Sequence, residues 1–265
     1  MMKIDELAHY RKHQVFEELE RYVHFYETFA TAVATFVTIG TNQYIFNIDS
    51  YLYSSIQGTL ESIRNILWNG KISDAYTLLR KYYDSAIVNV YINLYLRDHC
   101  SIENFVVDKV NDWLKNNRKL PEYKEMVRYI KKHAELAPIN RLFEQDNRYQ
   151  AIRDRCNDHT HYNCFDNILL NISEVFVQNR SLTLDRLGVD LTDLFILHLS
   201  YIFFLNAHYM SSSDYVDHLE CGMTPPSDSE YWVAPFVQET FDEILKKHRP
   251  DLADLIKANT SMHLA

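Results

Sequence analysis

The hydrophobic and polar positions of this chain follow the period of an α-helix over most of its length. Apolar residues recur at roughly 3.6-residue spacing in the opening segment, which predicts one or two helices over residues 3–36. The last long apolar segment is apolar on nearly every side, which is typical of the most buried helix in a protein. Four further helices are predicted, over residues 44–69, 71–98, 148–178 and 190–217. The pattern therefore predicts an all-α protein.

Short breaks separate the predicted helices. Asn69-Gly70 is a helix stop signal, and Ser73-Asp74 starts the next helix, so the helices on either side should form an antiparallel hairpin. The stretch from Ser181 to Asp185 is predicted to be a further break followed by a helix start. Long helices with short connections favour a four-helix bundle core with additional peripheral helices.

Three segments are expected from this organisation. They are an N-terminal helical extension (1–43), a helical bundle (44–217) and a C-terminal loop with a helical tail (218–265). The bundle carries a helical insert at about 101–146, which Pro121 and Pro138 interrupt. Its helices are expected at 104–116 and 122–134, peripheral to the core bundle.

Composition supports the helical prediction and adds one electrostatic feature. The chain has 5 Gly and 6 Pro, where average usage would give about 19 and 13, and tight turns of β-rich proteins need both residues. Its net charge is −9, yet Lys109 to Arg155 holds 12 Lys/Arg against 7 Asp/Glu. A basic segment on an acidic chain fits either a localised anion site or a solvated helical surface.

The cysteines and the N-terminus indicate a reducing compartment. The four cysteines show no paired spacing of the kind that zinc sites use, so free thiols are expected; they are Cys100, Cys156, Cys164 and Cys221. The start of the chain has no apolar signal core, and the apolar run 29–40 is shorter than the about 20 residues that span a bilayer. We therefore expect a soluble, cytoplasmic protein without a membrane segment.

Candidate chemistry concentrates between Arg153 and Asn163. Arg153 precedes His159 by six residues, and Arg155 precedes His161 by the same spacing. Residues six apart on a continuous helix do not share a face closely. A break at Asn157-Asp158 is expected, because Asn and Asp favour turns and N-caps. Such a break would gather Arg and His side chains over a helix N-terminus, where free N–H groups favour an anion.

A metal site is the weaker alternative at this stretch. His159, His161 and Cys164 could each bind a metal, but the sequence offers no fourth ligand. We expect no metal and no other cofactor. Both histidines could instead be solvent-facing or capping residues.

The stretch resembles the signature of the HEPN superfamily, in which an Arg is followed after four to six residues by a His. Arg155 to His161 fits that spacing, and Asn157 to Asn163 is similar to an Asn-Asp-x-x-His-x-Asn ending of some members. Arg153 with His159 is a second possible register. The resemblance implies a helical bundle, metal-independent RNase activity and a site built across two protomers, hence a homodimer.

A second likeness lies in the predicted hairpin. Gly70 to Arg80 resembles the Gly-x4-Ala-x2-Leu-x-Arg start of a helix in HEPN-like abortive-infection proteins. Asp84 follows Arg80 at i+4, on the same helix face. Under the resemblance, both residues would line the pocket from the facing helix, and Asp84 would hold an Arg in place. The simpler alternative is a surface ion pair, which contributes little to stability.

The resemblance implies a chemistry that needs no metal, because RNA can be cut by its own 2′-OH. His161 would be the general acid/base, since His titrates near neutral pH. Arg155 would clamp the phosphate with its planar fork of donors, and Asn157 would orient or cap. Arg153 and His159 would support the site.

The leading functional hypothesis is accordingly a HEPN-like endoribonuclease in phage defence or a toxin–antitoxin setting. Its partners would be RNA, a second copy of the chain, and an antitoxin or another protein. The alternative is a non-catalytic helical-bundle module that binds RNA, a nucleotide or a protein partner. A purely structural interaction protein is the third hypothesis. Convergence of the Arg155 and His161 side chains would favour the first.

Overall fold

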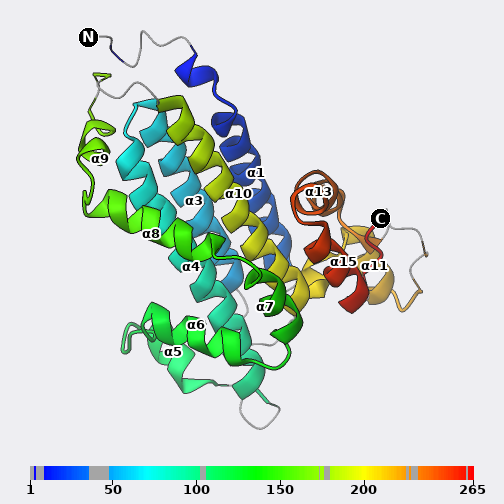
Figure 1. Cartoon of the computed structure of the whole chain (residues 1–265). Coiled ribbons are helices and arrows are strands. Elements are labelled where there is room, and N and C mark those ends of the chain that lie inside the picture. Colours follow the sequence, from blue (N-terminus) through cyan, green and yellow to red (C-terminus); the bar gives the residue numbers. More distant parts are fainter. Residues whose placement is uncertain are drawn as a thin grey trace. The chain divides into compact units, whose positions relative to one another are not determined.

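The computed structural model describes most of the chain (Figure 1). The described residues are 3, 9–35, 48–101, 106–172, 174–175, 180–224, 227, 232–260 and 262–265. Parts of several predicted helices, namely residues 4–8, 36, 44–47, 104–105, 173 and 176–178, lie outside them.

The all-α prediction is confirmed. All regular secondary structure in the described part of the chain is helical. The only β-type pairings there are two isolated bridges, Lys3 with Glu174 and Ser211 with Val233. The chain folds into two compact units. Unit 1 holds Met1–Asn89 and Asn147–Phe195, and unit 2 holds Val90–Asp146 and Ile196–Ala265.

Unit 1 is a bundle of long helices. Three of them begin and end within the unit: α1 (Val15–Thr35), α3 (Ile48–Trp68) and α8 (Arg148–Thr160). It also contains the first part of α4 (Ile72–His99), the first part of α10 (Arg180–Leu205) and the short α9 (Phe165–Leu169). These elements include four helices at the predicted bundle positions, and α1 packs along α3 as well.

Aromatic side chains fill the core of unit 1. Tyr26 on α1 stacks edge-on with Phe195 and Tyr82, and its hydroxyl lies 2.9 Å from the Tyr82 hydroxyl. The rings of Phe29 and Tyr53 pack beside them, with their centroids 4.8 Å from each other. All five side chains are fully buried. Each buried aromatic ring removes a large apolar area from water, so α1 is an integral part of this core.

Three predicted helix boundaries are wrong, and one of them is the end expected at residue 217, since α10 ends at Leu205. The break expected from Ser181 to Asp185 lies inside α10, which already starts at Arg180. Leu184 and Leu187 are fully buried, so apolar packing overrides the turn tendency of this polar stretch. The helix expected to run to residue 178 ends at Thr160, the end of α8.

Arg180 explains why α10 begins so early. Its buried guanidinium donates hydrogen bonds of 2.9–3.0 Å to the carbonyl oxygens of Gly70, Leu169 and Ile172. Two of these carbonyls follow α3 and close α9, where helices leave acceptors without intrahelical partners. One cation therefore satisfies the ends of two helices and anchors the start of a third.

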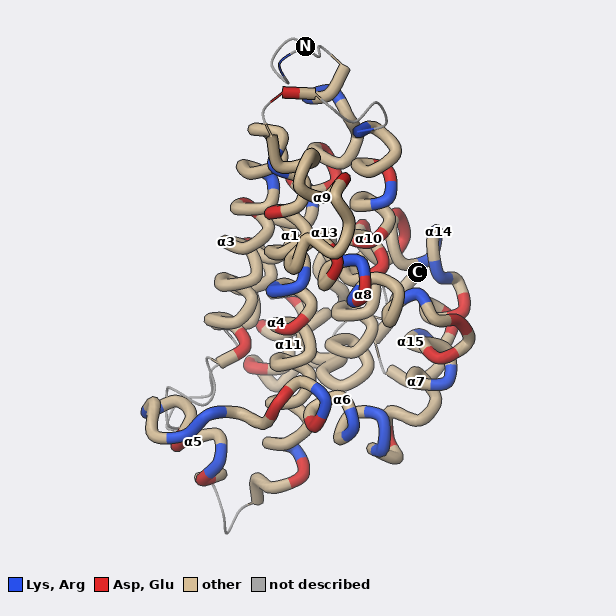
Figure 2. Tube along the Cα trace, turned by 60° about the vertical axis from the view of Figure 1, so that its left-hand side comes forward, with Lys and Arg blue, Asp and Glu red and all other residues tan. Residues whose placement is uncertain are grey.

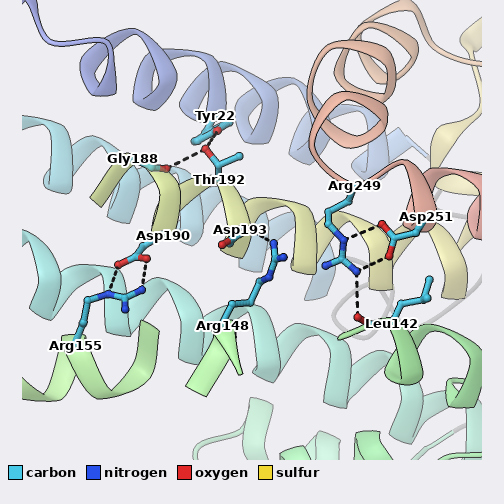
Figure 3. A network of polar contacts seen from close by, with 10 residues as sticks. All are labelled: Tyr22, Leu142, Arg148, Arg155, Gly188, Asp190, Thr192, Asp193, Arg249 and Asp251. Atoms are coloured by element: carbon cyan, nitrogen blue, oxygen red, sulfur yellow. Dashed lines mark hydrogen bonds and ion pairs between the residues drawn. The ribbon is translucent and has the colours of Figure 1, made fainter. Parts of the chain in front are cut away.

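Unit 2 combines the insert with the C-terminal part of the chain. Its shorter helices are α5 (Asp108–Leu114), α6 (Tyr123–Lys132), α7 (Ala137–Phe143), α11 (Ser213–Glu220), α13 (Pro235–Thr240), α14 (Lys246–His248) and α15 (Pro250–Asn259). A π-helical turn (Phe241–Leu245) joins α13 to α14. Arg249 ties the insert to the tail, because it pairs with Asp251 at 2.7 Å and donates to the Leu142 carbonyl (Figure 3).

One helix of the described chain is long and apolar enough to cross a membrane. It is α10, and 78% of its most apolar 18-residue stretch is buried inside the protein. Buried core helices of ordinary globular proteins meet the same criterion, so α10 is weak evidence for a membrane span.

Candidate functional site

The helix α8 runs without interruption through the stretch that the sequence singles out. The predicted break at Asn157-Asp158 is wrong, since α8 continues to Thr160 and His161 occupies its C-cap. The backbone turns only afterwards, at Tyr162 with a φ of 50°. A helix C-terminus carries partial negative charge, so this end of α8 does not attract an anion. The expected phosphate site over a helix N-terminus is therefore absent here.

Polar side chains join one face of α8 to α4. Arg153 donates to the Asp84 carboxylate at 2.7 Å, and Arg80 donates to the side-chain oxygen of Asn157. Arg80 also lies 3.9 Å from the other oxygen of Asp84. The chain positions run in opposite directions, so the two helices are antiparallel here. These contacts explain why Asn157 stays helical: its side chain serves a neighbouring helix instead of capping its own.

Arg155 lies on another face of α8 and pairs with Asp190 of α10 (Figure 3). Two guanidinium nitrogens meet the two carboxylate oxygens, with an Nε–Oδ2 distance of 2.8 Å. The Asp190 side chain is 1% exposed and the Arg155 side chain 30%. Burial raises the pKa of the Asp190 carboxyl, and the hydrogen bonds and charge of Arg155 oppose this rise. The Tyr76 hydroxyl adds a donor to Asp190 at 3.4 Å.

His159 is buried beside this ion pair. Its ring stacks on Tyr76 at 4.1 Å, nearly parallel, and its Nδ1 lies 2.9 Å from the Ser73 hydroxyl. Ser73 donates its single proton to the Asn167 carbonyl, so the Nδ1–H of His159 must be the donor to Ser73. Burial lowers the pKa of His159 to about 4. The ring is therefore neutral at pH 7 and carries its proton on Nδ1.

His161 is separate from all of these groups. It is exposed just beyond α8, and its side chain makes no hydrogen bond or ion pair with any described residue. Residues 162–166 and Ile168 are exposed too, and among them Phe165 is 71% and Ile168 40% exposed. Large apolar side chains at the surface can mark an interaction site, although single ones are common.

The structure thus groups the predicted residues differently from either proposed register. Arg155 is held by a buried carboxylate while His161 is exposed and uncontacted, and Arg153 faces α4 while His159 packs on Tyr76. Arg155 and His159, four residues apart, share one helix face instead.

Three partners in this cluster were not singled out from the sequence, namely Ser73, Tyr76 and Asp190. Asp190 could have been suspected, because Leu187 and Leu194 lie about one turn before and after it on the same helix face, and a carboxylate on an apolar face needs a cation to pair with.

Metal and thiol chemistry find little support in this region. In the part of the chain that the structure describes, no group of three or more His, Cys, Asp or Glu could hold a metal ion. Cys156 is fully buried, and burial raises its thiol pKa to about 12. A thiol that stays protonated at neutral pH is a poor nucleophile.

A second candidate site is the exposed cationic surface of unit 2. Residues 115–132 carry seven Lys/Arg and two Glu. Lys131 pairs with Glu144 at 2.7 Å, whereas the other six cations are exposed and form no ion pair with described residues. We call these six the basic face: Lys115, Arg118, Lys119, Lys124, Arg128 and Lys132. Figure 2 colours all Lys and Arg of the described residues blue along the trace.

The helix α6 orders half of the basic face. Lys124, Arg128 and Lys132 follow one another at four-residue intervals, which places them on one side of a helix. Met126 and Ile130 on the opposite side are buried. The cations are therefore fixed to a packed helix and point to solvent as a row, so they offer a ready site for a polyanion.

The Arg155–Asp190 pair yields a stability prediction. Replacing Arg155 by Ala leaves a buried carboxylate without its cation, and we expect the free energy of unfolding to fall by about 3–5 kcal/mol. The double variant Arg155→Met with Asp190→Leu should recover most of this loss, because no charge stays buried. Urea denaturation at pH 7 measures both. Lys246→Ala, in an exposed pair with Asp242, is the control and should cost at most about 1 kcal/mol. If Arg155→Ala lowered the free energy of unfolding by as little as Lys246→Ala does, the Arg155–Asp190 pair would not have the structural role assigned to it.

The buried His159 yields a pH prediction. Its folded-state pKa of about 4 lies below the ordinary 6.5, so between these values the unfolded chain binds more protons and stability falls as pH drops. His159→Gln should weaken this dependence between pH 7 and pH 5 in thermal or urea unfolding. Part of it should stay, because burial also lowers the pKa of His198 to about 3. The exposed His161→Gln should behave like wild type; an unchanged slope in His159→Gln would refute the assignment.

Comparisons with known proteins give no match: no family model, no curated protein and no solved structure is similar to this chain. The likeness of Arg155–Asn163 to HEPN proteins consequently remains a hypothesis from sequence. Any functional proposal rests on the chemistry of the two candidate sites.

Proposed function

We propose that this chain is a helical module that binds RNA through its basic face and does not cleave it. The observation that carries the proposal is the row of exposed cations on α6, which have no acidic partner among the described residues. RNA presents a regular row of phosphates, and neutralising them releases counterions, which drives binding by Lys and Arg. On a chain with a net charge of −9, such a row is the natural point of contact for a polyanion.

A membrane surface is a poorer fit to the same cations. Helices that lie on membranes insert an apolar face beside their basic one. Two apolar side chains of α6, Met126 and Ile130, are buried within unit 2 and cannot insert. The basic face therefore offers charge alone, which suits a phosphate backbone.

The contacts of the arginines in unit 1 support the proposal that the chain does not cleave RNA. Arg80, Arg153 and Arg155 each have a side-chain partner on another helix. His159 is buried and neutral at pH 7. A phosphate clamp needs free donors, and these donors already stabilise the bundle.

RNA binding can be tested by removing charge from α6. The variant Lys124→Gln, Arg128→Gln, Lys132→Gln should bind a short single-stranded RNA on the order of tenfold more weakly or worse. The slope of log affinity against log salt should also fall by about 2, because each phosphate contact in a single strand contributes about 0.7. Fluorescence anisotropy over a salt series measures both quantities.

A matched control removes the same charge elsewhere. Lys81, Arg186 and Lys257 are exposed and lie outside the basic face. Their triple Gln variant has the same net charge as the α6 variant and should keep wild-type affinity within a few-fold. Equal weakening by both triple variants would show that only the overall charge matters, and the basic face would lose its role.

A ribonuclease is the second candidate, and one observation favours it. His161 is exposed and free of described partners, and the neighbouring Phe165 and Ile168 present apolar surface. A second copy of the chain, bound at this surface, could place a cationic side chain next to His161, which has no such partner among the described residues of its own chain. The resemblance to HEPN proteins implies such a shared site.

Incubation of purified protein with RNA in EDTA separates the two candidates. Under the RNA-binding proposal, the wild-type protein shows no RNA cleavage that depends on His161, so wild type and His161→Ala should behave alike. Cleavage by wild type and by His24→Ala, an exposed histidine on α1, together with its loss in His161→Ala, would overturn the proposal in favour of the nuclease. His161→Ala is preferable to a variant of Arg155, because loss of Arg155 should destabilise the fold and would confuse the two effects.

A further inference from the structure

Beside the basic face, unit 2 contains a pocket of about 300 Å³. It lies between the C-terminal end of α4 and the helix α6. Its lining combines aromatic, cationic and acidic side chains, namely Asp98, Glu125, Arg128, Tyr129, Lys132 and His133. Two of these, Arg128 and Lys132, also belong to the basic face.

One carboxylate holds the rings of the pocket in place. Asp98 accepts a hydrogen bond from the Tyr129 hydroxyl, and it lies 3.1 Å from Nε2 of His133. Burial alone would raise the pKa of Asp98, but these hydrogen bonds outweigh burial and keep the pKa below its ordinary value. Behind Tyr129, the rings of Tyr91 and Tyr95 pack at 5.4 and 5.9 Å. The ring positions are thus fixed before any ligand binds, which lowers the entropy cost of binding.

The mixed charge of the lining indicates the class of ligand. Glu125 is exposed at the pocket and would repel a bare phosphate, but a carboxylate accepts hydrogen bonds from N–H groups. A nucleobase presents such donors on its edge and an aromatic face for stacking. Arg128 and Lys132 beside the pocket suit the phosphates on either side of a base.

We propose that this pocket holds one unpaired base of a single-stranded RNA, whose neighbouring phosphates bind Arg128 and Lys132. The base stacks on the ring of Tyr129 or His133 and donates to Glu125. A base inside a duplex has its edge paired and its faces stacked, so it cannot enter. The inference rests on the RNA binding proposed above and adds a preference for single strands.

Anisotropy with a labelled single-stranded RNA and with the corresponding duplex tests this preference. Wild type should bind the single strand more tightly. Tyr129→Ala should weaken single-strand binding about tenfold, as expected for the loss of one stacked base, and leave duplex binding unchanged. Tyr129→Phe keeps the ring and should keep the preference. Tyr51→Ala, which removes an exposed tyrosine of unit 1, is the control and should match wild type.

Glu125→Ala provides a test at an exposed position, where the fold does not depend on the side chain. If phosphate attraction alone governed this region, removing a negative charge would strengthen binding to both RNAs. The base pocket predicts the opposite for the single strand, a several-fold weakening, with duplex binding equal or stronger. Tighter single-strand binding by Glu125→Ala would overturn the inference.

The outcomes also separate this inference from the proposed function. If the α6 charge variant loses affinity while wild type binds both RNAs equally, RNA binding stands and the base pocket falls. If wild type binds neither RNA, both fail. Free adenosine monophosphate serves as a competitor in the same anisotropy experiment. If it displaces the labelled RNA at concentrations similar to those at which unlabelled single-stranded RNA does, the pocket is a mononucleotide site and the single-strand assignment is overturned.

Discussion

The structure of unit 1 depends on one buried charge, the carboxylate of Asp190. The helix α10 contains a long apolar stretch, most of which is buried. A buried carboxylate is tolerated only where a cation and hydrogen-bond donors meet it. Arg155 and Tyr76 supply these in one arrangement, so we infer that the pair selects how α8, α4 and α10 fit together.

The helical periodicity predicted the fold class and the cores of the long helices, because burial of an apolar stripe decides where a helix lies. It failed where polar residues have partners distant in sequence. Asn157 favours a helix end locally, yet Arg80 on another helix binds its side chain. Arg180 supports the start of α10 by donating to four carbonyl oxygens, and one of them, that of Gly70, lies 110 residues away in the sequence. Long-range contacts of this kind leave no periodic signal.

The candidate chemistry was predicted less well than the fold, for the same reason. Spacing along the chain suggested that Arg155 should act with His161, whereas helix geometry and Asp190 direct Arg155 away. His159 proved to be a buried stacking residue, which its sequence neighbours do not indicate. Whether an Arg or His is a ligand-binding group depends on whether the fold already occupies its donors. That property requires knowledge of the facing helix.

The same criterion separates the two polar clusters of this protein. The arginines of α8 are numerous and close together, which attracts attention in the sequence, but a carboxylate on another helix has taken up each of them. The cations of α6 are less conspicuous in the sequence, and those of the basic face have no acidic partner among the described residues. An acidic chain has many carboxylates available to pair with Lys and Arg. A row of cations that stays unpaired on such a chain keeps its donors available, and availability of donors is what a phosphate backbone requires.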